Sequence, residues 1–258
     1  PEPLAPPFDF ERRLDPEALA LIVDVGGGTS DFSVVRLGPQ RAHQGERSAD
    51  ILATAGVHIG GTDFDRKLSL DELMPLLGLG HAGPQGRPVP SGIFFDLATW
   101  HLINFQYAPR VISRVQGLRS DYADPQLHER LMTVLRERLG HRLAGQVEQA
   151  KISCSVHGQM AHIALDDVEP GLAAFLAPDR MAQDLDELLE SVVACAQECV
   201  RRAGLQGRGP DVVYLTGGSS ALKTLQERLG TAFAGVPLVQ GDLFGGVAAG
   251  LAYAAQRT

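Results

Sequence analysis

Two aspartates bracket a run of three glycines near the start of the chain, in the stretch Asp24-Val25-Gly26-Gly27-Gly28-Thr29-Ser30-Asp31. Apolar runs precede and follow it, so we expect a strand, a tight glycine turn and a returning strand. Glycines let backbone N–H groups come close to a bound anion. The two carboxylates would repel a phosphate directly, but they suit a divalent metal or its waters beside it. On its own, the stretch fits both a phosphate-and-metal site and an ordinary glycine hairpin.

Two further glycine turns follow apolar, strand-like runs. Gly60-Gly61 comes after residues 51–55 and precedes a helix that Thr62 or Asp63 would cap. Gly217-Gly218-Ser219 comes after residues 212–216 and precedes a helix over 222–229, whose first N–H groups form a potential phosphate cradle. Because α/β folds gather such loops at the carboxyl ends of their strands, we expect the three turns to converge on one polyphosphate. The alternative is three unrelated glycine loops.

Strand-like and helix-like patterns occur along the whole chain, which predicts an α/β fold. The expected elements are a strand pair over 21–37, further strands at 51–55, 160–165, 212–216 and 237–239, and helices over 125–150, 183–203, 222–229 and 245–255. Gly140 or Gly145 would break the first of these helices. Five aromatic residues gather between Phe94 and Tyr107, where we expect a small satellite core under a long insertion, with a partner-binding face as the alternative.

The composition limits the classes of function. The chain has 258 residues, 44% of them hydrophobic and 21% charged, as in ordinary soluble globular proteins. With a net charge of −8 and no basic stripe, nucleic acid is not an expected partner, and no apolar run approaches the roughly 20 residues that span a membrane. Three cysteines favour a reducing cytoplasm. The chain begins at Pro1 without Met or a signal peptide, so we expect a piece of a longer protein.

Four motifs together resemble the nucleotide-binding domain of DnaK-type heat-shock chaperones, which belong to the actin and sugar-kinase ATPase superfamily. In family order they are the second phosphate loop at 24–31, the Leu-Gly-Gly-x-Asp-Phe-Asp motif at 59–65, the adenosine-contacting helix at 148–155 and the adenosine loop at 215–219. The third motif is Glu148-Gln149-Ala150-Lys151 followed by Ser155. Residues 73–78 and 214–219 are closer to the YegD-like branch of putative chaperones.

The resemblance implies a fold and a domain order. It implies an actin-like ATPase (ribonuclease H-like) core subdomain over 15–65 and 170–258, and an inserted α+β subdomain over 66–169 that caps the adenosine side. Residues 1–14 would be the segment between two lobes, because Glu2-Pro3-Leu4-Ala5 resembles the end of the family's first lobe. The first phosphate loop and the catalytic lysine of that first lobe have no counterpart here. We therefore expect the second lobe of a cytoplasmic, ATP-hydrolysing chaperone-like protein, inactive as this piece alone.

The same resemblance assigns the phosphate and metal residues of a site for ATP or ADP with Mg²⁺. Asp24 and Asp31 would hold the magnesium hydration shell and, with Thr29, form the catalytic group. The backbone at Gly26, Gly27, Gly28 and Thr29 would hold the terminal phosphates, and the Thr29 hydroxyl could also donate to a phosphate oxygen. The loop residues that would line the cleft or approach the α-phosphate are Gly60, Gly61, Gly217, Gly218 and Ser219.

On the adenosine side, Glu148 and Lys151 would bind the ribose hydroxyls and Ser155 the adenine. Two arginines that flank adenine in the family are Ile152 and Ala221 here. An arginine face on a base contributes about 1–2 kcal/mol, so we expect weaker or less adenine-selective binding.

Two other functions stay open. One is a small-molecule kinase of the same superfamily, which would need an acceptor-binding aspartate in the missing lobe. The other is a non-enzymatic interaction module with a degenerate nucleotide site. The partners expected from the resemblance are the nucleotide, the first lobe, and protein clients or co-chaperones. Neither the client nor the oligomeric state follows from the sequence.

Overall fold

The computed structural model describes residues 17–41, 47–84, 86–205 and 207–241. The expected segment over 1–14 and the expected helix over 245–255 lie outside these residues. The chain divides into two compact units, one formed by Pro1–Gly61 with Glu187–Thr258 and the other by Thr62–Asp186. The subdomain borders drawn from the family resemblance, after residues 65 and 169, stay predictions.

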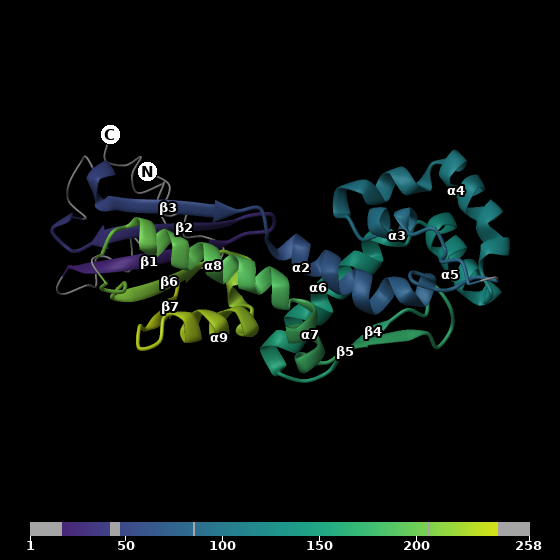
Figure 1. The fold of residues 1–258 in the computed structure, drawn as a ribbon. Coiled ribbons are helices and arrows are strands. Elements are labelled where there is room, and N and C mark those ends of the chain that lie inside the picture. The colour runs from purple at the N-terminus through teal and green to yellow at the C-terminus, as the bar shows by residue number, and fades with distance from the viewer. Residues whose placement is uncertain (1–16, 42–46, 85, 206, 242–258) are drawn as a thin grey trace, which may run out of the picture. The chain divides into compact units, whose positions relative to one another are not determined.

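A mixed five-stranded sheet forms the centre of the first unit, in the order β3-β2-β1-β6-β7 (Figure 1). β1 (Ala18–Val25) and β2 (Ser30–Leu37) form the expected antiparallel hairpin, and β3 (Ile51–Val57) pairs antiparallel with β2. β6 (Val212–Thr216) runs parallel to β1, and β7 (Leu238–Gln240) runs parallel to β6. With helices in the same unit, this sheet confirms the α/β class.

β1 is the middle strand of the sheet, and its sequence suits that place. Neighbouring residues of a strand point to opposite faces, and both faces of β1 are buried along most of its length. On one face, Ala20 and Ile22 pack in a cluster with Val35, Val212 and Tyr214. Asp24 follows on that same face, so the apolar packing ends where the first acid stands.

Helix α8 (Asp186–Arg202) enters the first unit at Glu187 and lies along the sheet (Figure 1). Its buried side chains are Leu189, Val192, Ala196 and Cys199. Burial raises the pKa of the Cys199 thiol to about 11, although a backbone hydrogen bond with Val34 of β2 lowers it. The helix predicted over 183–203 is confirmed, and Gly204 ends it with φ +64°. The unit also contains two 3-10 turns, η3 (Ser48–Asp50) and η8 (Gly218–Ala221), and helix α9 (Lys223–Ala232).

The second unit is mostly helical, with one two-stranded hairpin. Its elements are α2 (Gly61–Leu68), the π-helical η4 (Ser69–Leu73), the 3-10 turn η5 (Met74–Leu77), α3 (Gly92–Leu97), the 3-10 segment η6 (Trp100–Tyr107), α4 (Pro109–Gln116), the 3-10 turn η7 (Gly117–Asp121), α5 (Pro125–Arg136), α6 (Gly140–His157), β4 (Ala161–Ala164), β5 (Ala173–Leu176) and α7 (Pro178–Asp184). None of the described helices is long and apolar enough to cross a membrane.

The long helix predicted from Pro125 onward is present as two helices. The Asp124 side chain caps α5 by accepting from the Gln126 N–H at 2.9 Å, with Pro125 at the first helical position. The break falls at Gly140, one of the two glycines proposed for it. The Tyr107 hydroxyl accepts a hydrogen bond from the Gly140 N–H at 3.0 Å, which fixes the start of α6.

The aromatic segment divides between core and surface. Phe94 is fully buried, which agrees with the expected satellite core. Phe95, Trp100 and Phe105 stay exposed, so the segment also presents a large apolar surface.

Candidate functional site

The three glycine turns meet at one edge of the five-stranded sheet. β1 and β6 are parallel, and β3 runs in the same direction because both β1 and β3 are antiparallel to β2. The carboxyl ends of these strands therefore lie at the same edge. The turns at 26–29, 58–61 and 217–218 follow those ends directly. In the sheet order, β1 has the antiparallel strand β2 on one side and the parallel strand β6 on the other. The topology of the sheet therefore changes beside the end of β1.

The second turn packs directly against the first. The Gly61 N–H donates to the Gly26 carbonyl at 3.0 Å. A Cβ atom on Gly60 would lie 2.6 Å from the carbonyl carbon of Gly27 and 2.7 Å from the Gly28 nitrogen. A Cβ on Gly61 would overlap the Ser219 hydroxyl of the third turn. A side chain at residue 60 would therefore push the first two turns apart, whereas one at residue 61 would displace the Ser219 hydroxyl.

The third turn reaches the first aspartate. Gly217 has φ +79°, a conformation that side-chain-bearing residues rarely adopt. A Cβ on Gly217 would lie 2.5 Å from Asp24 Oδ1 and 2.5 Å from the Val25 carbonyl oxygen. The turn then continues into η8, where the Ser220 hydroxyl donates back to the Gly217 carbonyl at 2.7 Å.

The helix predicted over 222–229 after this turn is confirmed as α9, but the 3-10 turn η8 separates it from Gly217. Leu222 is extended after η8, and α9 begins only at Lys223. The back-bonding Ser220 closes a separate short turn, so the N-terminus of α9 is not part of the glycine turn. In contrast, the second turn leads directly into α2, as expected.

The first turn is open on its outer side. The Gly26 N–H donates to the Thr29 carbonyl at 3.0 Å, which closes the hairpin. Gly27, Gly28 and Thr29 are exposed, and a Cβ on Gly27 or Gly28 would meet nothing within 4 Å. None of the three glycines of this turn has a φ in the left-handed region. Their role is therefore to keep the outer surface of the turn clear of side chains, rather than to permit an unusual backbone conformation.

Asp24 and Asp31 face each other across the β1–β2 hairpin. They are register partners, so both side chains project from the same face of the sheet. Like charges directly opposite each other destabilise a strand pair. Thr216 of β6 is the register partner of Asp24 on its other side, and Gly56 of β3 stands beside Asp31. The carboxyl edge of the sheet thus ends in a polar group formed by two carboxylates and one hydroxyl.

This donor set fits a metal ion bound through water. In the described part of the chain, no group of three or more His, Cys, Asp and Glu side chains could hold a metal ion. Two carboxylates are too few to enclose an ion, but Mg²⁺ commonly keeps several waters and uses one or two carboxylates together with phosphate oxygens. Asp24 and Asp31 are thus suited to orient such waters.

The adenosine-side residues predicted from the resemblance lie on α6 in the second unit. Glu148, Lys151 and Ser155 are spaced three and four apart, so they share one face of the helix. Lys151 and Ser155 are buried, and Glu148 is exposed. The two departures differ in setting, since Ile152 is 43% exposed on α6 and Ala221 lies in η8 of the first unit.

Asp65 is a site residue that the sequence reading did not single out. Lys151 Nζ lies 2.8 Å from Asp65 Oδ1, and both side chains are largely buried. Burial raises the pKa of the Asp65 carboxyl, the Lys151 ammonium opposes that rise, and the Glu148 charge adds to it. Asp65 is the last residue of the 59–65 motif, which was the available signal. Its pairing with a lysine far along the chain is a tertiary contact that the sequence does not show.

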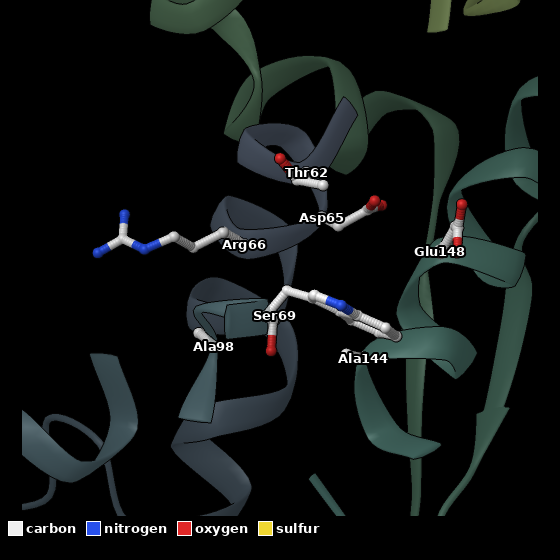
Figure 2. Close-up of a pocket in the computed structure, with 8 residues that line it drawn as sticks. Thr62, Asp65, Arg66, Ser69, Ala98, Ala144 and Glu148 are labelled. Carbon is white, nitrogen blue, oxygen red and sulfur yellow. The ribbon is translucent and has the colours of Figure 1, made fainter. Parts of the chain in front are cut away.

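A cavity of about 170 Å³ opens beside this pair, wholly within the second unit. Its lining residues come from α2, η4, the stretch between the end of α3 and the start of η6, and α6, and they are Thr62, Asp65, Arg66, Ser69, Ala98, Trp100, Ala144 and Glu148. Figure 2 shows the Asp65 carboxylate directed toward Glu148, whereas Arg66 extends the opposite way. The cavity is lined both by Trp100 and by Glu148, which the resemblance assigned to the ribose.

The predicted site residues therefore form two groups. One group surrounds Asp24 at the sheet edge of the first unit, and the other surrounds Lys151 in the second unit. No model of a known protein family matches the chain. The chain belongs to the α/β class, with a mixed five-stranded sheet and a small two-stranded sheet.

Proposed function

We propose that this chain is the second lobe of an ATP-binding, ATP-hydrolysing protein of the DnaK type, with an actin-like core and closest to the YegD-like branch. One observation carries the proposal. Three glycine turns, distant in sequence, meet at the carboxyl edge of one sheet around two facing carboxylates. Unrelated glycine loops would have no reason to interlock so closely that side chains are excluded between them.

The phosphates of the nucleotide would lie against the first turn. Its outer surface carries no side chains at Gly27 and Gly28, so backbone can approach an anion closely. The Thr29 hydroxyl is exposed beside them and can donate to a phosphate oxygen. The resemblance assigns the loop at Gly217 to the α-phosphate.

A divalent cation accounts for the facing acids. Asp24 and Asp31 repel each other without a counter-charge, and both would orient the waters of a bound Mg²⁺. When bound, Mg²⁺ supplies positive charge to the phosphate oxygens during phosphoryl transfer. Binding of the cation would then explain why two like charges stand opposite each other in this strand pair, although their repulsion destabilises it.

The α6 group would bind the nucleoside. Glu148 and Lys151 would bond the ribose hydroxyls, with Asp65 holding the Lys151 ammonium in place. Ser155 would reach the adenine. Ile152 and Ala221 offer no guanidinium face, so we expect modest affinity and weak discrimination between adenine and guanine.

Phosphoryl transfer depends on positioning from all sides of the phosphate. In the family that the chain resembles, a facing lobe supplies the other half of the cleft. Turnover by this chain alone is therefore expected to be negligible.

Calorimetry of the protein with magnesium-ATP tests the proposal. We expect saturable binding that EDTA abolishes and that Asp24→Asn weakens about tenfold, because one of two carboxylates near the metal is lost. Glu190→Gln removes the same charge from the exposed side of α8 and serves as the matched control. Absence of saturable binding, or equal affinity in Asp24→Asn, would overturn the nucleotide assignment.

A non-enzymatic interaction module is the second candidate, and the exposed Phe95, Trp100 and Phe105 favour it. The same titration decides between the two. Wild-type affinity in Asp24→Asn, with no dependence on magnesium, would favour the module.

A further inference from the structure

The cavity beside α6 contains features that the proposed nucleotide site does not use. Trp100 lines it and is 54% exposed, which is unusual for so large an apolar side chain. Ala98 and Ala144 add small apolar side chains to the lining. At about 170 Å³, the cavity exceeds the roughly 150 Å³ of a cavity that holds a benzene ring. It therefore has room for a small organic group.

The charge inside the cavity is negative. Glu148 makes no ion pair with any residue that the structure describes, and its charge raises the pKa of Asp65, so the two carboxylates act on each other. The Lys151 ammonium is already engaged by Asp65 at 2.8 Å. An anion entering the cavity would meet the unpaired Glu148, whereas a cation would relieve the repulsion between the two acids.

Arg66 does not cancel this charge at the cavity. Its Nε donates to the Thr99 hydroxyl at 3.0 Å, which anchors the side chain. Figure 2 shows its guanidinium extending away from both Asp65 and Glu148. The one lining residue with a positive charge is therefore fixed on the outer side.

An indole attracts cations more strongly than any other aromatic side chain, through the negative face of its ring. The Trp100 ring is held by an edge contact with the His141 ring of α6, at 4.8 Å between centroids. A cation seated between Trp100 and Glu148 would meet an aromatic surface and a carboxylate at once. The apolar alanines of the lining suit a short hydrocarbon chain behind that charge.

We propose that this cavity binds an alkylammonium group, with Glu148 pairing with its charge and Trp100 packing against it. The group could belong to a small free amine or to a lysine side chain of a peptide, which share this chemistry. The inference goes beyond the proposed function, because its residues all lie in the second unit and amine binding needs no nucleotide. Glu148 is common to both sites, so the test is made without ATP.

Trp100 is the single tryptophan of the chain, so its fluorescence reports on the cavity directly. The protein is titrated with n-butylammonium chloride, with n-butanol as the neutral match and sodium chloride to hold ionic strength constant. We expect a saturable change with the amine that butanol does not cause and that added salt weakens. Nα-acetyl-lysine amide separates the two sources, since binding at least as tight as that of butylammonium indicates a peptide lysine and weaker binding a free amine.

Variants test the two recognition elements. Glu148→Gln should weaken butylammonium binding about fivefold, whereas Glu190→Gln should leave it unchanged. Trp100→Leu, followed by ligand-observed NMR because the reporter is lost, should weaken it by a similar factor. No saturable change, an equal response to butanol, or wild-type affinity in Glu148→Gln would overturn the inference.

Failure of this inference is distinguishable from failure of the proposed function. Trp100 has no role in the proposed nucleotide site, so Trp100→Leu should still bind magnesium-ATP. Amine binding without ATP binding would refute only the nucleotide assignment, and ATP binding without amine binding would refute only the alkylammonium site. Circular dichroism of each variant confirms that it is folded.

Discussion

The sheet edge around Asp24 and the α6 region around Lys151 are built in opposite ways. At the sheet edge, turns interlock through their backbones, and glycine is required because side chains have no room. Around α6, the site consists of side chains that project from helices, held by the Asp65–Lys151 pair. Backbone sites tolerate few substitutions, whereas side-chain sites can lose a member and keep the fold. The two departures from the family that the sequence resembles, Ile152 and Ala221, would both concern the adenosine side.

The variant with the largest expected effect on stability is Gly60→Val, which tests the backbone packing at the sheet edge. The new side chain would overlap the backbone of Gly27 and Gly28, which cannot move without opening the hairpin. We expect a loss of about 3 kcal/mol in the free energy of unfolding, measured by urea denaturation. Gly145→Ala is the control, because this α6 glycine has open space around it and should gain about 0.5–1 kcal/mol. Equal effects of the two substitutions would contradict the backbone interlock.

Breaking the ion pair of the α6 region should cost somewhat less. Lys151→Met leaves the largely buried Asp65 carboxylate without its partner, and we expect a loss of about 2 kcal/mol at pH 7. The loss should shrink at pH 4, because Asp65, whose pKa is already raised by burial, can then take up a proton. Urea unfolding at both pH values measures it. A loss that is the same at pH 4 and pH 7 would show that the charge of Asp65 is not responsible.

The second unit also contains a carboxyl group whose protonation should change the free energy of unfolding. Burial, followed by a hydrogen bond with Glu72, raises the pKa of the Asp184 carboxyl in α7 to about 6, although Arg180 pairs with both acids. Because this pKa lies above the value in the unfolded chain, protonation of Asp184 stabilises the folded state. This stabilisation is fully present below about pH 4 and is lost as the pH rises through 6.

Asp184→Asn keeps a hydrogen-bonding group there without the charge. We expect it to raise the free energy of unfolding by about 1 kcal/mol at pH 7.5 and to have little effect at pH 4. Thermal unfolding across that range measures the difference. A stabilisation that does not depend on pH would argue against ionisation of Asp184 as its cause.

The smallest effect concerns the facing acids of the sheet edge. Asp31→Asn should stabilise the protein by about 0.5 kcal/mol without magnesium or nucleotide, because it removes a like-charge pair across β1 and β2. The same variant should lose any stabilisation that magnesium-ATP gives to the wild type. Both are measured by thermal unfolding. Destabilisation of the free protein would mean that the two carboxylates do not repel each other.

Local patterns predicted most of the sheet edge. The β1–β2 hairpin and the three glycine turns each involve short stretches, and strand direction then dictates that the turns meet. The helix after the third turn was also predicted, but the 3-10 turn η8 was not, because the Ser220 hydroxyl that closes it is a detail of one side chain. On α6, the helix and its break at Gly140 were predictable from spacing, but its tertiary partners were not.

The strand β5 and the helix α7 were not predicted. β5 is only four residues long and includes two alanines, so it carries little strand signal. α7 begins with Pro178 at its first position, a start signal that was available. The Asp65–Lys151 pair and the cavity that Trp100 and Glu148 both line depend on how helices pack, which no local pattern reports.

The central place of β1 has a consequence for amide hydrogen exchange. Its hydrogen bonds are made on both sides, to β2 and β6, so amides such as those of Ile22 and Val23 should exchange only on global unfolding. The exposed turn at Gly27 and Gly28 begins only a few residues farther along and should exchange quickly. A ligand bound to this turn should therefore slow amide exchange in one short peptide that contains the turn. The amides of the neighbouring strand β1 already exchange so slowly that binding should not change their rates measurably.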